Sequence, residues 1–253
     1  MKNTVNVFIV TGSSRGLGYE IARQLLAKKC TMLTLARHTH AGLADAAADS
    51  GATLAQWTVD LAHAVGAAAR LEAWLHGMDG RTIASATLIN NAGVLGRVGP
   101  LEKMTSEELA TVLRVNLEAP MALTGAFLRA TSAWAGPRKV LNISSGAGRK
   151  PIHGWAAYCA SKAGLDHFTR VTALDEARRE NGARIVSLAP GMIDTDMQGQ
   201  LRTASAADFP EHAHFVQVHA SGQLMTPAQS AAKVLAYLAR KDFGQEPVAD
   251  VRL

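Results

Sequence analysis

The sequence has little cysteine, few aromatic residues and no long apolar run. Its two cysteines, Cys30 and Cys159, do not form a Cys-x-x-Cys pair, so no disulfide framework is expected. No apolar stretch reaches the ~18 residues that a transmembrane helix requires. The apolar run Val5–Val10 is too short for a signal peptide and leads directly into a glycine-rich turn. We therefore expect a cytoplasmic protein with no membrane partner.

Charged residues make up 19% of the 253-residue chain and form no block of one sign. No basic run carries interleaved aromatic residues, which argues against a nucleic-acid partner. The formal net charge of +5 has two interpretations: a solvated basic surface, or steering of an anionic ligand such as a phosphorylated cofactor. Hydrophobic residues account for 48% of the chain, which is enough for a substantial core.

Short apolar or β-branched runs alternate with longer segments that have apolar residues at helical spacing. Strands are expected at Val5–Val10, Thr31–Ala36, Thr53–Val59, Ala86–Asn90, Lys139–Ser144, Ala183–Leu188 and Pro247–Val251. Helices are expected at Gly18–Ala27, Ala64–Leu75, Ser106–Arg129, Trp155–Arg179 and Pro227–Arg240. This alternation predicts an α/β fold, a single-domain doubly wound parallel sheet over residues 1–253 with helices on both faces. Its ligand crevice would lie at the carboxyl ends of the strands.

The first expected strand ends in a glycine-rich turn, which reads Thr-Gly-Ser-Ser-Arg-Gly-Leu-Gly over residues 11–18. Glycines permit a tight turn and the close approach of a pyrophosphate, to which the following helix offers unpaired N–H groups. An ordinary strand-to-helix turn is the alternative, but the position between strand and helix favours a dinucleotide site. The predicted cofactor contacts in this turn are Gly12, Ser14, Arg15, Gly16, Leu17 and Gly18.

The end of the second expected strand indicates which dinucleotide is bound. NAD-binding folds usually place an acidic residue there, which holds the ribose 2′-hydroxyl, but this sequence reads Leu-Ala-Arg-His over residues 35–38. The guanidinium groups of Arg37 and Arg15 could bind a 2′-phosphate, so NADP (NADPH) is the predicted cofactor. Both arginines could instead be ordinary surface residues. Asp60, after the third strand, could bond the adenine amino group, cap the next helix, or do both.

Tyr158 and Lys162 are four residues apart on an expected helix, so both project from one face. A free phenol titrates near ~10. A neighbouring ammonium favours the phenolate, which would let Tyr158 exchange a proton with a carbonyl group. Ser145, after a strand, would donate a hydrogen bond to the substrate oxygen. Asn116 could hold a water that links Lys162 to solvent. The alternative is an aromatic ring packed beside a lysine stem.

Together these motifs resemble the short-chain dehydrogenase/reductase family, which has a Rossmann fold. The matching segments span essentially the whole chain: Thr11–Gly18, Asp60, Asn90–Gly93, Asn116, Ser145, Tyr158–Lys162, and Pro190-Gly191 followed by Thr195. The resemblance implies that Asn116, Ser145, Tyr158 and Lys162 are the catalytic residues. It also implies cofactor contacts by Leu61, Asn91, Ala92, Gly93, Tyr158, Lys162, Pro190, Gly191, Ile193 and Thr195. Members form homodimers or homotetramers, here through Ser106–Arg129 and Trp155–Arg179.

Within the family, the sequence is similar to sepiapterin reductases and to bacterial and yeast benzil reductases. The similar segments lie at residues 35–37, 154–159 and 194–198 and near the C-terminus. This similarity implies that Asp250 anchors the substrate, with an exposed tail acid as the alternative. Residues 195–226 are expected to form a variable lid over the substrate.

The predicted substrate site contains Ser145, Trp155, Met192, Met197 and Asp250. Trp155 could flank an aromatic substrate or pack at the start of its helix. The apolar side chains of Met192 and Met197, with that of Leu95, favour a bulky and partly aromatic ketone or diketone.

The predicted function is NADPH-dependent reduction of a bulky, aromatic or pterin-like ketone or diketone. The alternatives are reduction of a 3-oxoacyl thioester, another alcohol dehydrogenation of this family, and a non-enzymatic NADPH-sensing regulator. A regulator would be expected to lose Tyr158 or Lys162, and a redox-neutral epimerase would carry a larger C-terminal domain. No metal site is predicted, because the histidine pairs at 38–40 and 212–214 lack a third ligand. Cys159 points about 100° away from Tyr158 on the helix, so a core filler is favoured over a nucleophile.

Overall fold

The computed structural model describes residues 4–27 and 29–252, and within them seven strands form one sheet. All neighbouring strands are parallel, in the order β3-β2-β1-β4-β5-β6-β7. The strands are β1 (Val5–Thr11), β2 (Cys30–Ala36), β3 (Thr53–Thr58), β4 (Ile83–Asn90), β5 (Arg138–Ile143), β6 (Arg184–Ala189) and β7 (Val248–Asp250). The predicted doubly wound parallel sheet is confirmed.

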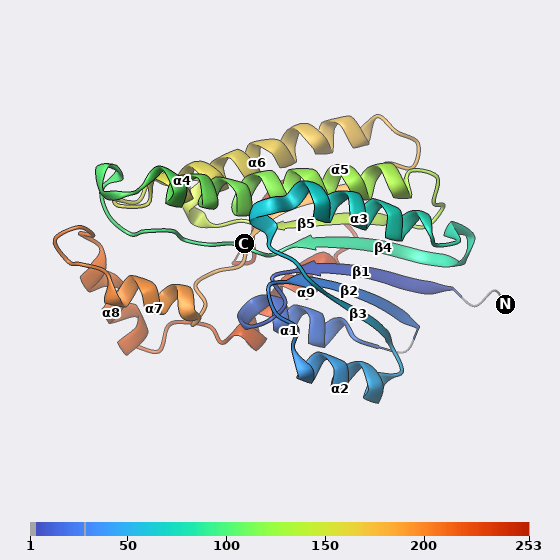
Figure 1. Ribbon diagram of the computed structural model, residues 1–253, viewed down its shortest axis with the longest axis horizontal. Helices are drawn as coiled ribbons and strands as arrows, with labels where there is room; N and C mark the ends of the chain where they lie inside the picture. Colours follow the sequence, from blue (N-terminus) through green and yellow to red (C-terminus); the bar gives the residue numbers. More distant parts are fainter. Residues whose placement is uncertain (1–3, 28, 253) are drawn as a thin grey trace.

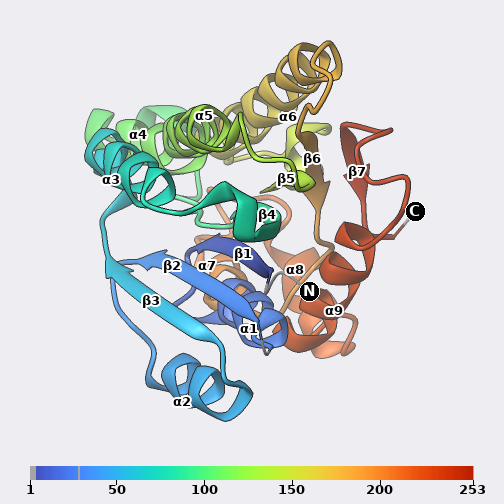
Figure 2. The ribbon, with the colours of Figure 1, turned by 90° about the vertical axis from the view of Figure 1, so that its right-hand side faces the viewer.

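Helices cover both faces of this sheet (Figure 2). One face carries α3 (Ala64–His76), α4 (Ser106–Leu113), α5 (Ala119–Thr131) and α6 (Ala156–Ala177). The other face carries α1 (Gly16–Leu25), α2 (Ala41–Ser50) and α9 (Pro227–Leu238). Two further helices, α7 (Asp196–Thr203) and α8 (His212–Ala220), project beyond the carboxyl ends of the strands (Figure 1).

An apolar layer fills the space on each side of the sheet. Because successive side chains of a strand point to opposite faces, Ile9 packs in the layer of α3 and α5, whereas Val10 packs in the layer of α1 and α9. Leu71 of α3 and Ile21 of α1 are fully buried in these two layers. Burial on both faces explains why the strands read as continuous apolar runs in the sequence.

The strand order places the ligand crevice. From β1 the chain runs outward through β2 and β3, then returns to β4 on the other side of β1 and continues to β7. The loops after β1 and β4 therefore diverge at their carboxyl ends, and an open α/β sheet binds its ligand at such a point. The loops that follow β5 and β6 border the same edge.

Two predicted helices differ from the observed ones. The first begins at Gly16 rather than Gly18, so the glycines form its first turn. The segment predicted as one helix over Ser106–Arg129 begins with a capping box at Thr105 but is divided by a π turn over Arg114–Glu118. Asn116 lies inside that turn, where its side chain binds both backbone groups of Val94. These tertiary bonds, which sequence periodicity does not report, accompany the local widening.

Three helices, α2, α7 and α8, were not predicted from the sequence. The α2 segment is rich in alanine and buries only Leu43 and Ala47, so it carries almost no apolar periodicity. The α7 segment is largely polar and buries Gln198 and Leu201. A short helix with so few buried positions forms through tertiary contacts rather than through its own pattern.

Leu71→Ala should destabilise the protein strongly, because it removes a fully buried side chain from the layer between α3 and the sheet. Such truncations cost about 2–5 kcal/mol. The measurement is urea unfolding followed by circular dichroism. Val65→Ala is the matched control on the same helix, since Val65 is 73% exposed, and it should change the free energy of unfolding by no more than ~0.5 kcal/mol. Equal effects of the two substitutions would contradict this assignment of the core.

Candidate active site

A cavity of about 1800 Å³ lies at the carboxyl ends of the strands. It is lined by every residue predicted to bind the cofactor or substrate, from Gly12 to Asp250. Among the predicted catalytic residues, Ser145, Tyr158 and Lys162 also line it, whereas Asn116 is fully buried behind the wall. The structure therefore brings residues from the ends of all seven strands and from α6 to one cavity.

The glycine turn forms a cradle into which a dinucleotide pyrophosphate fits. Gly12 has φ +69°, and a Cβ atom there would lie 2.8 Å from the Cα of Ala92. A Cβ atom on Gly18 would lie 2.2 Å from the carbonyl oxygen of Gly12. The helix that follows has Arg15 at its N-cap with no side-chain cap and no acidic residue in its first turn. Its N–H groups are therefore available to an anionic group.

The same turn is tied to the end of β4. The Thr11 hydroxyl accepts hydrogen bonds from the backbone N–H groups of Asn91 (2.9 Å) and Ala92 (3.0 Å). The Asn91 side chain in turn donates to the carbonyl oxygens of Thr11 (2.9 Å) and Gly12 (3.2 Å). These bonds fix the two sides of the crevice relative to each other before any ligand binds.

Three charged residues predicted to bind the cofactor have different environments in the cavity wall. Arg37 is exposed at the cavity wall. Arg15 forms an ion pair with Asp196 of α7, and both side chains are 68% exposed. Asp60 accepts a hydrogen bond from the N–H of Ala62 at 2.9 Å, so it caps the short helical turn after β3. The capping role considered for Asp60 is confirmed.

Tyr158 and Lys162 lie one turn apart on α6 and are 6% and 4% exposed. The Lys162 Nζ donates a hydrogen bond to the carbonyl of Ile143 at 2.8 Å and lies 5.7 Å from the centroid of the Tyr158 ring. Ser145, just after β5, begins a helical turn in which its hydroxyl accepts from the N–H of Ala147 at 3.2 Å. The ammonium, the phenol and this hydroxyl thus line one part of the cavity.

Burial changes the acidity of both groups. Desolvation raises the pKa of Tyr158 to about 12, although a hydrogen bond with the Ser145 side chain acts in the opposite direction. Desolvation lowers the pKa of Lys162 to about 8, against the attraction of Asp166. The expectation that the ammonium makes the phenol more acidic is wrong for the protein without ligands, because the loss of solvation has the larger effect. At neutral pH the phenol is protonated and most Lys162 side chains are charged.

Asn116 acts within the protein scaffold. Its amide oxygen accepts from the N–H of Val94 (2.8 Å), and its amide nitrogen donates to the Val94 carbonyl (2.8 Å) and to the Ser161 hydroxyl (3.2 Å). A Cβ atom on Gly93 would lie 3.4 Å from the Asn116 oxygen and 3.7 Å from the Lys162 Nζ. Asn116 therefore holds the loop after β4 beside the ammonium, and a water bridge from its side chain remains a prediction.

The part of the cavity wall beside Tyr158 is aromatic. Trp155 is 8% exposed and lies 5.6 Å from the Tyr158 ring in edge-to-face contact. Phe209 and Phe215, from the segment that carries α7 and α8, lie 5.9 Å and 5.6 Å from Trp155. Trp155 thus packs at the start of α6 and also lines the cavity, while its contact with an aromatic substrate stays a prediction. Met192 and Met197 are half-buried in the same wall.

Asp250 is 6% exposed, so the alternative of an exposed tail acid is wrong. Its carboxylate accepts hydrogen bonds from the Nε (2.8 Å), Nη2 (2.6 Å) and backbone N–H (3.0 Å) of Arg252. This pairing keeps the pKa of the Asp250 carboxyl below its usual range. Sequence reasoning missed Arg252, whose spacing of two residues from Asp250 is typical of no particular motif.

Several other residues at the site were not predicted. Phe209 and Phe215 lie in a segment whose sequence has no periodic pattern, and only the fold places them against Trp155. The position of Asp166 near the site was predictable, because it follows Lys162 by four residues and both side chains therefore lie on one face of α6.

The glycine cradle facing a buried tyrosine–lysine pair defines an oxidoreductase that acts on carbonyl or hydroxyl groups with a nicotinamide cofactor. The sequence profile of the family described as short chain dehydrogenase matches residues 6–206, and the chain belongs to this family. The expected family resemblance is confirmed.

Related proteins support the same assignment. The benzil reductase ((S)-benzoin forming) of Bacillus cereus is 35% identical over 240 residues, which cover 95% of this chain and 96% of that protein. The sepiapterin reductase of Rattus norvegicus is 32% identical over 247 residues, covering 94% and 92%. The crystal structure of the KRED1-Pglu enzyme aligns with a TM-score of 0.81 at 28% identity, covering 96% of this chain and 99% of that one. No helix in the described part of the chain is long and apolar enough to cross a membrane.

Gly18→Ala should weaken dinucleotide binding, because the added Cβ would lie 2.2 Å from the Gly12 carbonyl and 2.3 Å from the Asn91 amide nitrogen. Overpacking of this kind costs about 1–3 kcal/mol, so the dissociation constant for NADPH should rise by roughly tenfold or more. Fluorescence titration measures it. Gly66→Ala on α3 is the control, since its Cβ would meet nothing within 4 Å. An unchanged affinity for Gly18→Ala would show that the turn does not cradle the cofactor.

Proposed function

We propose that this protein is an NADPH-dependent carbonyl reductase that acts on bulky ketones or diketones. The observation that carries the proposal is the buried Tyr158 phenol, which is protonated at neutral pH and lies beside the Lys162 ammonium in the cavity. Reduction of a carbonyl group needs a proton donor at the oxygen. A phenol that keeps its proton until negative charge develops nearby suits that role.

A bound dihydronicotinamide would supply the hydride to the carbonyl carbon. As the C=O bond opens, Tyr158 gives its hydroxyl proton to the carbonyl oxygen, so an alcohol forms and the phenolate remains. The Lys162 ammonium stabilises that phenolate, and the Ser145 hydroxyl donates a hydrogen bond to the oxygen while its charge develops. Lys162 would also bind the ribose hydroxyls. Asn116 positions the loop after β4 through its bonds to Val94.

The preference for NADPH rests on the end of β2. Arg37 stands at the cavity wall where an acidic residue would hold the ribose 2′-hydroxyl of NAD. A guanidinium there binds a 2′-phosphate in a bidentate manner. The remaining cofactor contacts follow the cavity wall: Ser14, Arg15 and Leu17 at the pyrophosphate, Asp60 and Leu61 at the adenine, and Ile193 and Thr195 at the carboxamide.

The aromatic wall supports a substrate with flat apolar groups. Trp155, Phe209 and Phe215 form one cluster with Tyr158, and aromatic pairs add about 0.5–1.5 kcal/mol beyond their apolar burial. Benzil, the substrate named for two Bacillus relatives, has two such rings. We place the substrate between this cluster and Met192, with residues 195–226 as its lid and Asp250 at the far end. Residues 1–253 then serve as one catalytic domain.

Exposed apolar residues on the outer helices support a homo-oligomer. Val171 and Leu174 on α6 are 46% and 70% exposed, and Met121 on α5 is 44% exposed. These positions lie on the two long helical segments through which the family resemblance implies assembly. We propose that a homodimer or homotetramer covers them.

Tyr158→Phe should lose turnover by about 10²–10⁴-fold, the usual contribution of a positioned acid, while NADPH binding is retained because the ring still fills its site. Turnover is measured as NADPH oxidation with benzil, sepiapterin, small diketones and a 3-oxoacyl thioester. Tyr237→Phe on α9 is the matched control outside the cavity. Undiminished turnover by Tyr158→Phe would remove this mechanism, and a marked preference for the thioester would favour the alternative substrate class.

Arg37→Asp should raise the KM for NADPH far more than the KM for NADH, because it replaces the proposed phosphate ligand with a like charge. A hydrogen bond to a charged group contributes about 1.5–3 kcal/mol, so the KM ratio should change by roughly tenfold or more. Lys233→Asp, an exposed position on α9, makes the same charge change away from the cavity. Equal effects on both cofactors would rule out a 2′-phosphate contact at Arg37.

A further inference from the structure

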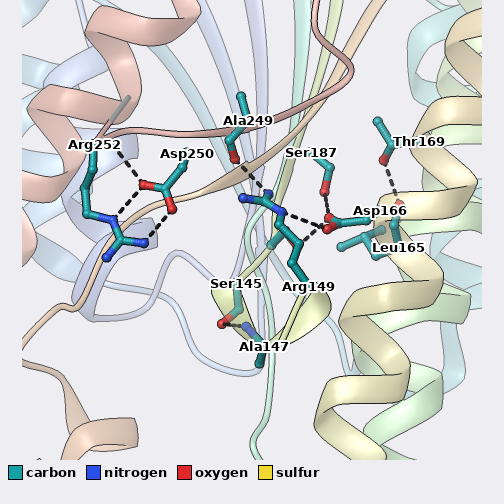
Figure 3. A network of polar contacts seen from close by, with 11 residues as sticks. Ser145, Ala147, Arg149, Leu165, Asp166, Thr169, Ser187, Ala249, Asp250 and Arg252 are labelled. Atoms are coloured by element: carbon teal, nitrogen blue, oxygen red, sulfur yellow. Dashed lines mark hydrogen bonds and ion pairs between the residues drawn. The ribbon is translucent and has the colours of Figure 1, made fainter. Parts of the chain in front are cut away.

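The proposed mechanism leaves one buried carboxylate near the tyrosine–lysine pair without a role. Asp166 follows Lys162 by one turn of α6 and is 1% exposed. One of its oxygens accepts hydrogen bonds from the hydroxyls of Ser144 and Ser187, each at 2.6 Å. The other oxygen faces the Arg149 guanidinium, with the Nε at 3.2 Å (Figure 3). Each oxygen of this buried acid is therefore partnered.

The partners of Asp166 belong to the strand ends that form the cavity. Ser144 immediately precedes Ser145, and Ser187 lies in β6. Arg149 also donates to the carbonyl of Ala249 at 2.8 Å, next to Asp250 in β7 (Figure 3). One carboxylate thus connects α6 to β5 and β6 directly, and to β7 through a guanidinium.

The end of β5 is held to α6 at two consecutive residues. The Lys162 ammonium binds the carbonyl of Ile143, and the Asp166 carboxylate binds the hydroxyl of Ser144. Gly148 passes between these contacts, since a Cβ atom there would lie 2.9 Å from the Lys162 backbone and 3.1 Å from the Asp166 carboxylate. The residues on both sides of Ser145 are therefore in close contact with the helix, Ile143 and Ser144 through hydrogen bonds and Gly148 through packing.

Asp166 also acts on Lys162 through its charge, which raises the pKa of the ammonium against the effect of desolvation. The other groups around the ammonium come from several elements: the phenol of Tyr158 on α6, the Ile143 carbonyl of β5, Gly93 after β4, and the Asn116 amide of the π turn beside Gly93. Of these groups and Asp166, only Asp166 has a carboxylate. The next charged side chain outward, Arg149, faces Asp166. A negative charge one helical turn away favours the protonated amine.

We propose that Asp166 is a positioning residue for the reaction: its carboxylate keeps Lys162 in the ammonium form and aligns the Ser145 end of β5 with Tyr158. This inference rests on the proposed function, in which the charged Lys162 stabilises the Tyr158 phenolate. If the carboxylate served only to hold the strands together, its removal would leave the pKa of Lys162 unchanged. The titration therefore separates the two roles.

The test compares the wild-type protein with Asp166→Asn, Arg149→Met and Asp175→Asn. The Asp166→Asn change removes the negative charge while preserving the shape of the side chain. Arg149→Met removes the positive charge that faces this carboxylate and puts an unbranched apolar side chain in its place. Asp175→Asn is the matched control, because Asp175 is exposed and lies ~14 Å farther along α6, beyond the screening length at ordinary salt.

The first readout is the titration of the Lys162 Cε resonance by ¹³C NMR in the protein without cofactor, assigned with Lys162→Met. The wild-type midpoint is expected at about 8. It should fall by about one pH unit in Asp166→Asn, because an opposite charge at this range moves a pKa by that order. It should rise in Arg149→Met and stay in place in Asp175→Asn. Should Asp166→Asn fail to fold, the upward movement in Arg149→Met still tests the claim.

The second readout is the pH dependence of kcat/KM for NADPH, which reports the ionisation of the free protein. The ammonium is the active form, so kcat/KM falls as pH rises through the Lys162 pKa. This limb should move to lower pH in Asp166→Asn and to higher pH in Arg149→Met. If the midpoints do not move in either variant while Tyr158→Phe abolishes turnover, the inference about Asp166 is wrong and the proposed function still stands. Full turnover by Tyr158→Phe would instead overturn the proposed function, whatever Lys162 does.

Discussion

The active site depends on burying an ammonium group and a phenol side by side at the end of β5. Burying a charge is costly unless its hydrogen bonds are made, and the Lys162 ammonium has the Ile143 carbonyl as a partner. The same desolvation that brings the pKa of Lys162 down to about 8 carries that of Tyr158 up to about 12. The free protein therefore holds both protons near neutral pH, which is the state that carbonyl reduction requires. A more exposed pair would not be preorganised in this way.

Such a pair keeps its geometry only if α6 is fixed to the sheet. Buried polar side chains do this: the Asn90 amide donates to the Asn142 amide oxygen at 2.8 Å, and the Asn142 amide donates to the Thr169 hydroxyl of α6 at 2.9 Å. Asp166 adds its bonds one turn nearer the site. The core around the crevice thus uses buried polar networks, whose directional hydrogen bonds define a single arrangement where interchangeable apolar contacts would allow several.

The sequence was sufficient to predict the alternation of strands and helices, the glycine turn and the tyrosine–lysine spacing, because each of these is local. The sequence does not show how deeply Tyr158 is buried, so the predicted direction of its pKa shift was wrong. The π turn around Asn116 depends on a bond to Val94, 22 residues earlier, and periodicity cannot report such a contact. Asp166 stood at a readable spacing from Lys162, yet its partners come from β5 and β6 and only folding brings them together.

The substrate side resists prediction for a related reason. The contacts of the segment that carries α7 and α8 with the rest of the protein differ in strength along its length. At its start, Arg15 and Asp196 form an ion pair with both side chains 68% exposed, and exposed pairs contribute only about 0–1 kcal/mol. Farther along, Phe209 is fully buried and stacks on Trp155. Because its firm contact is with Trp155 of the cavity wall, the shape of this part of the cavity follows from how those rings pack. A sequence without periodicity in this segment does not specify that packing.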